Sequence, residues 1–531
     1  MKEPLRYFNA NGCFGDGSRP TPYFRSASEI LAHMDRLGIE KSLVWHTTAK
    51  NFHTIWGNQR LLEEIKKSGD GTRLIPAFTV SPEMFYESGA VEGLKKEMLD
   101  NRARALRIFP GALNHSLCQI ETVVQAVREL KPILFFDCCD FFNLEELLCF
   151  ARDHPDVPMV ITQVIWVHLM PVLDLMRCCE NVYMDTSFLV TPNGIEMIVR
   201  EFGAGRLLFG MGFQSNNGAS LAALHYADIS EDEREMIAHI NLKALLGLES
   251  AEPVYQDVTE KNSGSLWHNF LHEPTVGLDI IDAHGHLGPC NTNIMLGGNI
   301  VEQIKALLPV MNRFGVTTMI VSGMQALLTD SVEGNRVLEN SVRAYPERFL
   351  GYLSYNPHYE KELLPLIDDF FSRDFFVGFK LHCDYWAVPV TDPRFIPVWE
   401  YADRHRLPIL LHTWESDYNS PAILSGIVPR YPNAVFILGH SGGGDVGRRE
   451  AEVLAGAHEN VFLEFCGSYT SAIPYEETIQ RVGVQKVLFG TDALFHNPIW
   501  EIGRALSMDI SIEDLKFMMA GTMRKILSKR R

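Results

Sequence analysis

Several features that would assign this chain to a membrane, secreted or nucleic-acid-binding class are missing from its sequence. No apolar stretch approaches the ~18 residues that a membrane span requires, and no charged region followed by an apolar run and a cleavage site is present at the amino terminus. The formal net charge is −18 at pH 7. Affinity for nucleic acid or anionic lipid is therefore not expected, because both need clustered Lys and Arg.

The ten cysteines have no disulfide-framework spacing. Because a chain of this size does not need covalent cross-links to hold its core, we expect reduced thiols. Together with the missing leader, this composition predicts a cytoplasmic protein that binds neither membrane nor nucleic acid.

The length and composition predict two large domains. The chain has 531 residues, of which 46% are hydrophobic and 21% charged, and one hydrophobic core does not usually organise so many residues. Each half is about the size of a (β/α)₈ barrel, roughly 250 residues.

The chain also repeats itself. Residues 8–15, FNANGCFG, align with residues 281–288, IDAHGHLG, and the correspondence continues with gaps through both halves. Positions that both copies share are expected to build the fold, and positions that differ are expected to mark the functional site.

Short β-branched and aliphatic runs alternate with helical patterns in both halves, which is typical of βαβ units and a parallel sheet. The predicted strands of the first half are 5–10, 41–46, 73–80, 105–108, 132–136, 158–162, 182–185 and 206–210. Those of the second half are 278–283, 317–322, 349–355, 376–381, 408–412, 434–439, 461–465 and 486–490.

The predicted fold class is thus α/β, with two tandem (β/α)₈ TIM-type barrels of which the first lacks metal ligands. We predict a degenerate, non-catalytic barrel over 1–250, a polar linker over 251–277 and a catalytic barrel over 278–531.

A glycine-rich segment near the sixth strand of the second half matches the dinucleotide-binding pattern G-x-G-x-x-G. It runs from Gly442 to Gly447, and Glu464 follows at about the expected distance. The strand before it is one of eight in a repeating barrel and is followed directly by His440. We therefore interpret these glycines as a tight turn that lets the backbone approach the site.

Polar residues at the strand ends of the second half form the candidate site. The carboxyl ends of parallel strands meet at one mouth of a barrel, where catalytic groups lie. His284 and His286 are expected just past strand one, and the remaining candidates are Lys380, His412, His440 and Asp492, at or just after strands four, five, six and eight. A lone histidine at a strand end is usually structural, but six candidates at one end of the barrel favour a shared site.

These residue types are typical of a metal centre. In an extended segment, His284 and His286 lie on the same side and can share one cation. Three imidazoles and a carboxylate suit Zn²⁺ and leave room for a water, whose pKa the ion lowers towards about 7. The first half has lost this set: its aligned residues are Asn11, Cys13, Arg107, Phe136, Gln163 and Gly212.

The second half resembles the amidohydrolase superfamily, and within it the amidohydrolase-related group that includes aminocarboxymuconate semialdehyde decarboxylases. The matching segments are 281–286 (IDAHGH), 378–382 (GFKLH), 409–413 (ILLHT), 437–443 (ILGHSGG) and 488–492 (LFGTD). The resemblance implies His284, His286, His412 and Asp492 as ligands of one divalent metal ion. His440 would polarise the substrate or steady the attacking water. The first half resembles the same family in fold only.

Lys380 leaves the number of metal ions open. In some relatives the lysine of strand four is carbamylated and bridges two ions, whereas in this group one ion is usual and a basic residue here binds substrate. We expect one ion, Zn²⁺ before Mn²⁺ or Fe²⁺, with a second only if Lys380 is carbamylated. Lys380 and His382 are candidate substrate-binding residues, and Asp282 is expected to orient a ligand imidazole.

The first functional hypothesis is a hydrolase that uses metal-bound hydroxide to attack the carbonyl of an amide, lactone or cyclic imide, with catalytic roles for Asp492 and His440. The alternative is metal-dependent, non-oxidative decarboxylation of a hydroxyaromatic or unsaturated acid. A third hypothesis is a non-catalytic metal-binding scaffold. All three involve a small molecule or ion and no macromolecule.

The first barrel is expected to take the place of a homodimer partner, giving an intrachain pseudo-dimer to which further oligomerisation can add. A rival interpretation is that Cys13, Asp137 and Cys138 form an altered metal site.

Overall fold

The computed structural model describes residues 5–17, 24–140, 144–212, 218–248, 265–275, 277–291, 296–469 and 471–530. The chain divides into two compact units, Met1–His268 and Asn269–Arg531. Within the predicted linker, helix α13 spans Leu266–His272, and residues 249–264 lie outside the described part. No helix among the described residues is both long and apolar enough to span a lipid bilayer.

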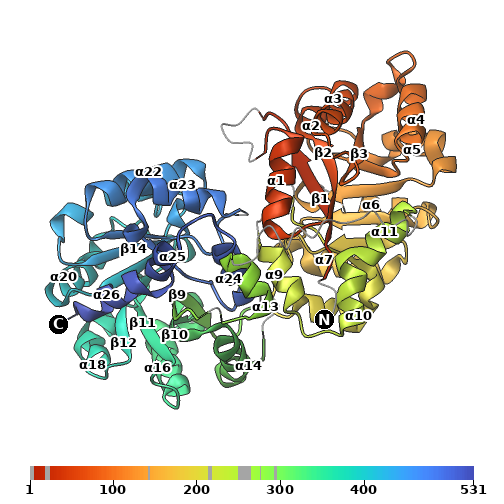
Figure 1. Ribbon diagram of the computed structural model, residues 1–531. Coiled ribbons are helices and arrows are strands. Elements are labelled where there is room, and N and C mark those ends of the chain that lie inside the picture. The colour runs from red at the N-terminus through yellow and green to blue at the C-terminus, as the bar shows by residue number, and fades with distance from the viewer. Residues whose placement is uncertain are drawn as a thin grey trace. The chain divides into compact units, whose positions relative to one another are not determined.

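Each unit contains one eight-stranded parallel sheet whose strands follow chain order. Figure 1 shows the ribbon of both units with several of these strands labelled. In the first unit the strands are β1 (Phe8–Phe14), β2 (Lys41–His46), β3 (Leu74–Val80), β4 (Ala105–Ile108), β5 (Ile133–Asp137), β6 (Met159–Thr162), β7 (Val182–Asp185) and β8 (Leu207–Leu208). In the second they are β9 (Ile280–Leu287), β10 (Val316–Gly323), β11 (Phe349–Ser354), β12 (Phe376–Leu381), β13 (Pro408–His412), β14 (Val435–Gly439), β15 (Val461–Glu464) and β16 (Val487–Leu488).

Helices connect successive strands around each sheet (Figure 1). The longer ones of the first unit are α1 (Ala27–Leu37), α3 (Thr54–Lys67), α4 (Ala90–Asp100), α5 (Leu117–Val127), α6 (Leu144–Asp153), α7 (Trp166–Cys178) and α8 (Gly194–Phe202). Those of the second are α14 (Ile300–Phe314), α16 (Ser331–Val342), α20 (Ile396–His405), α22 (Asp445–Ala457), α23 (Ile473–Val482) and α24 (Pro498–Leu506).

Backbone hydrogen bonds bring the last strand of each sheet back to the first. Ala10 N donates to Phe209 O over 2.8 Å, and Ala283 N donates to Phe489 O over 3.0 Å. Both units are therefore parallel barrels with helices between the strands, and the prediction of two tandem (β/α)₈ TIM barrels is confirmed.

The two barrels also share local details of the repeat. In each, the first helix begins at a polar cap and ends at a left-handed glycine: Ser26 and Gly38 flank α1, and Asn299 and Gly315 flank α14. These caps satisfy backbone groups that a helix end leaves unpaired. The shared ends show that the duplication preserved scaffold positions.

The first strand of each barrel is longer than predicted. The sequence-based boundaries end at Ala10 and Ala283, whereas β1 continues to Phe14 and β9 to Leu287. In β9 the ladder with β10 continues through the pairs Gly285–Val321 and His286–Ser322. The expectation that both histidines follow strand one is wrong, because backbone pairing continues past the point where the apolar pattern stops.

Candidate metal centre

The candidate ligands come from the strands of the second barrel and the loops that follow them. His284 and His286 lie within β9, and Lys380 and His412 lie at the ends of β12 and β13. Along β13 the inward face passes from the core residue Leu410 to His412, two positions later. The strand period therefore places a polar group directly above the apolar core.

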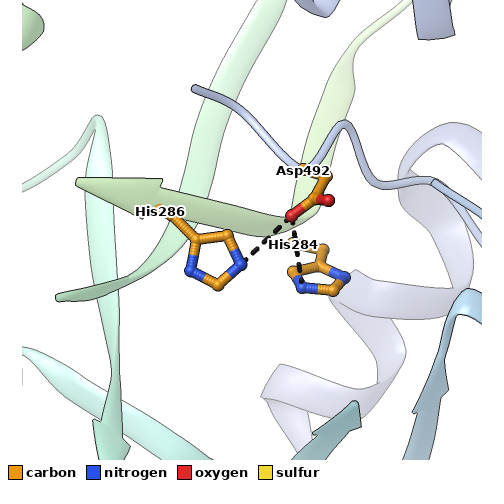
Figure 2. A group of neighbouring side chains, drawn as sticks. All are labelled: His284, His286 and Asp492. Carbon is orange, nitrogen blue, oxygen red and sulfur yellow. Dashed lines mark ion pairs between the residues drawn. The ribbon is translucent and has the colours of Figure 1, made fainter. Parts of the chain in front are cut away.

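Three ligand atoms converge beside β9 (Figure 2). Asp492 Oδ1 lies 3.1 Å from His286 Nε2 and 3.9 Å from His284 Nε2. A tetrahedral ion with bonds of about 2.1 Å keeps its ligand atoms roughly 3.4 Å apart. The trio thus has the spacing of one face of such a site, and the residues fit a divalent cation.

The other ring nitrogens of both histidines have buried partners. His284 Nδ1 lies 2.7 Å from Glu464 Oε2, and His286 Nδ1 lies 2.8 Å from Ser322 Oγ. These contacts fix the ring orientations, so that both Nε2 atoms lie on the side of Asp492. The sequence-based predictions include Glu464 only as the acidic residue that follows the glycine-rich segment, and they miss Ser322. Their positions on the inward faces of β15 and β10 give a signal that could have found them.

Asp282 holds the backbone rather than a ligand ring. Its Oδ1 accepts from the backbone N–H groups of His284 and Thr491, each over 3.1 Å, and its Oδ2 accepts from Thr491 Oγ1 over 2.5 Å. The expectation that Asp282 orients a ligand imidazole is therefore wrong. Its bonds instead tie β9 to the turn that carries Asp492.

The three ligand side chains are in the protonation states that a cation needs. Burial lowers the pKa of His284 well below its usual value and also lowers the pKa of His286. Burial alone would raise the pKa of Asp492, but the hydrogen bond from His286 and the nearby imidazoles hold it below its usual range. Neutral imidazoles and a carboxylate at neutral pH are metal ligands without further proton loss.

Lys380 lies directly against this trio. Its Nζ is fully buried and 2.8 Å from His284 Nε2, to which it donates. Burial lowers the pKa of Lys380 to about 8. The lysine therefore lies where a ligand of the ion, or a group bound to the ion, would be in contact with it.

His440 lies between the trio and the next histidine. It follows β14 with a positive φ of 64°, and its ring centroid lies 5.0 Å from that of His284 and 4.5 Å from that of His412. Its Nδ1 donates to Cys466 O over 2.7 Å. Burial lowers the pKa of His440 to about 4, so the ring is neutral and its Nε2 is an acceptor.

The turn after His440 is the glycine-rich segment. Gly442 and Gly443 both have positive φ, and a Cβ at either would lie 2.3 Å from another atom, in Gly447 and Trp414 respectively. This geometry agrees with the interpretation of a tight turn.

His412 belongs to an adjoining group with His382 and Asp384. The rings of His412 and His382 are stacked at 3.9 Å with planes 14° apart, and Asp384 Oδ2 lies 3.8 Å from His412 Nε2. An imidazole binds a metal in its own plane, so two nearly parallel rings do not share one ion in this arrangement. His412 as the fourth ligand stays a prediction, as does substrate binding by His382.

The first barrel retains the backbone of this site without its ligands. Gln163 and Gly212, which align with His440 and Asp492, have the same positive φ, 56° and 80°. Within the described part of the first barrel, no three His, Cys, Asp or Glu ligand atoms come together. Burial raises the pKa of Cys13 and of Cys138 to about 12, which keeps both thiols protonated.

Comparison with known protein families gives a match in both halves. An amidohydrolase family model matches residues 16–248 and again residues 281–528. The chain belongs to the amidohydrolase family. The double match agrees with the internal repeat and with the predicted resemblance to this superfamily. No curated protein matches the chain by sequence.

Solved structures with a similar fold each correspond to about one barrel. A 5-carboxyvanillate decarboxylase from Sphingomonas paucimobilis is 15% identical and covers 47% of this chain and 99% of its own, with a TM-score of 0.37. A 2,6-dihydroxybenzoate decarboxylase from Rhizobium is 17% identical, with 47% and 99% coverage and a TM-score of 0.36. A dihydroxybenzoic acid decarboxylase from Polaromonas sp. JS666, solved with manganese and 2-nitroresorcinol, is 18% identical, with 47% and 97% coverage and a TM-score of 0.35.

Proposed function

We propose that the second barrel is a metal-dependent hydrolase that cleaves an amide, lactone or cyclic imide. His284, His286 and Asp492 hold one divalent ion, Zn²⁺ or a similar ion, with His412 as the fourth ligand after its ring turns away from His382. When bound, such an ion polarises a carbonyl and makes a coordinated water acidic. The residues of the chain then have to orient the substrate and remove protons.

The observation that favours hydrolysis is the proton-accepting state of His440, which lies beside the trio, and of Asp492, which belongs to it. His440 has Nδ1–H bonded to Cys466 O, so its Nε2 is a bare acceptor in a neutral ring. The Asp492 carboxylate keeps its pKa low because of the imidazoles around it, although burial opposes this. Both groups can accept a proton from water, and Asp492 can pass one to a leaving group.

The tautomer of His440 with its hydrogen on Nδ1 bears on one of its two expected roles, the polarisation of the substrate. A neutral ring whose N–H points at a backbone carbonyl has no proton to donate to a developing oxyanion. We therefore assign His440 to water orientation or proton acceptance, and leave polarisation of the carbonyl to the ion.

Decarboxylation is the second candidate, and Lys380 favours it. A buried ammonium 2.8 Å from His284 Nε2 can pair with a substrate carboxylate and can return a proton to the carbon that loses CO₂. The ligand trio serves either reaction.

A product analysis separates the two reactions. The full chain, loaded with Zn²⁺ or Mn²⁺ in turn, is incubated in ¹⁸O-labelled water with lactones, cyclic imides, amides and hydroxyaromatic acids. Hydrolysis incorporates ¹⁸O without CO₂ release, whereas decarboxylation releases CO₂ and leaves the label in solvent. Asp492→Asn is the matched inactive control. A metal-loaded protein that converts no compound of either class would support the scaffold hypothesis.

A further inference from the structure

The first barrel contains a buried cation with an open hydrogen-bonding edge. Arg107, on β4, is 1% exposed, and its Nη1 donates to Asn11 Oδ1 over 3.1 Å. Its Nε and Nη2 have no hydrogen-bond partner, and neither has the amide Nδ2 of Asn11. Buried N–H groups are almost always paired, so these donors call for an acceptor, which can be a water, an ion or a ligand.

The nearby carboxylates do not close this edge. None of the described carboxylate oxygens lies within ion-pair distance of Arg107, although Asp137 and Asp185 are close enough to influence its pKa. Asp137 instead accepts from Gln163 Nε2 over 2.6 Å and from Cys139 N over 3.0 Å. Asp185 Oδ1 accepts from Ser187 Oγ over 2.7 Å.

Aromatic rings fix the position of the guanidinium. Its carbon lies 5.6 Å from the Trp45 ring centroid, 5.4 Å from that of Phe109 and 5.9 Å from that of Phe135. Lys50 lies on the same Phe109 ring at 4.5 Å and adds a second positive charge. The aromatic contacts hold the arginine side chain in place while leaving its donors free.

The identity of the free atoms indicates the ligand. Nε–H and Nη2–H form the side of a guanidinium whose two parallel donors match the two oxygens of a carboxylate. We propose that the first barrel binds a small carboxylate at Arg107 and Asn11, with a two-point contact to the Nε–Nη2 edge and a third hydrogen bond from Asn11 Nδ2. The bidentate fit selects a carboxylate over acceptors that offer a single oxygen.

The duplication gives this site a counterpart. Arg107 aligns with Lys380, and Asn11 aligns with His284. Arg107 bonds to Asn11 in the first barrel, just as Lys380 bonds to His284 in the second. The first barrel has thus kept a buried cation where the second has one, and replaced the metal ligands around it. The inference concerns the first barrel alone and does not depend on the reaction proposed for the second.

Calorimetric titration of the full chain with acetate, and with acetamide as the neutral isostere, tests this site. We expect acetate binding that Arg107→Lys weakens by about tenfold or more, because lysine keeps the charge but loses the fork. Arg104→Lys, a nearby arginine whose Nε donates to Lys131 O, is the matched control and should bind as the wild type does. Binding at the second barrel is common to all variants and cancels in the comparison.

A second variant, Asn11→Asp, tests the same site if Arg107→Lys does not fold. Asn11→Asp places a carboxylate beside the guanidinium, so acetate binding at this site should disappear while the thermal unfolding temperature rises. Equal acetate affinity in the wild type and either variant, or equal affinity for acetamide and acetate, would overturn the proposal and assign the open edge to water.

Discussion

Glu464 and His284, 180 positions apart in the sequence, are joined by a buried contact of 2.7 Å between a carboxylate oxygen and Nδ1. The Nε2 of the same ring faces Lys380 and Asp492. Burial raises the pKa of Glu464 to about 8, so the orientation of one metal-binding ring depends on a carboxyl group that has no solvent contact.

Replacing Glu464 by glutamine should weaken metal binding without unfolding the barrel. The amide keeps the volume but has one acceptor oxygen in place of the two that contact His284 Nδ1 and Cys466 N, so the contact that fixes the tautomer of His284 is weakened. Losses of about 10–100-fold in metal affinity are typical of such partners. Competition for Zn²⁺ with a chromogenic chelator measures this. Glu459→Gln, at an exposed position, is the control, and equal affinities in both variants would contradict the assigned role of Glu464.

Replacing His284 and Asp492 together by alanine should remove the metal. Two of the three converging ligand atoms are then missing, and we expect less than about 0.1 ion per chain by elemental analysis, with loss of any turnover. The matched control is Asn11→Ala at the aligned position of the first barrel, which should leave the metal content unchanged. Turnover that persists undiminished in the double variant would refute the metal centre.

The metal affinity should rise with pH through the titration of Lys380. Burial lowers its pKa to about 8, so below that pH an ammonium faces His284 Nε2 and repels an incoming cation, and above it the repulsion is lost. The pH dependence of the Zn²⁺ dissociation constant measures the effect. Lys380→Met should bind the ion at least as tightly and without this step. Weaker binding in Lys380→Met would instead indicate a carbamylated, bridging lysine and a second ion.

Replacing Gly442 by alanine should destabilise the second barrel. The residue has a φ of 85°, and a Cβ would lie 2.3 Å from the backbone of Gly447, so the turn after His440 has to open. The cost of forcing such a conformation is about 1–3 kcal/mol. Thermal unfolding checks it against Gly426→Ala, where a Cβ meets nothing within 4 Å. Equal unfolding temperatures would contradict the tight-turn interpretation.

The fold could be predicted because the repeat and the strand–helix alternation are local properties of the sequence. The predicted bounds of β12 and β13 agree with the structure residue for residue, and in each the polar residue comes only at or next to the last position of the strand. At β9 this rule fails, because hydrogen bonding to β10 extends the strand through the polar histidines.

The sequence predicts which residues form the candidate site better than it predicts the role of each residue. The strand period predicts His284 and His286 on one side of the first strand, and in the structure their ligand atoms lie together with that of Asp492. The partners of their rings, Glu464 and Ser322, come from strands distant in sequence, and only the closed barrel brings them together. The stacking of His382 on His412 depends on side-chain rotation, about which a strand pattern contains no information.

The left-handed backbone at Gln163 and Gly212 has an evolutionary consequence. A mutation alters a side chain far more easily than it reshapes a loop, and here Gln163 and Gly212 have a positive φ like that of His440 and Asp492 in the second barrel. The N-terminal barrel is therefore a natural starting point for engineering a second metal centre, in which histidines at Asn11, Cys13, Phe136 and Gln163 and an aspartate at Gly212 would be introduced onto an existing backbone.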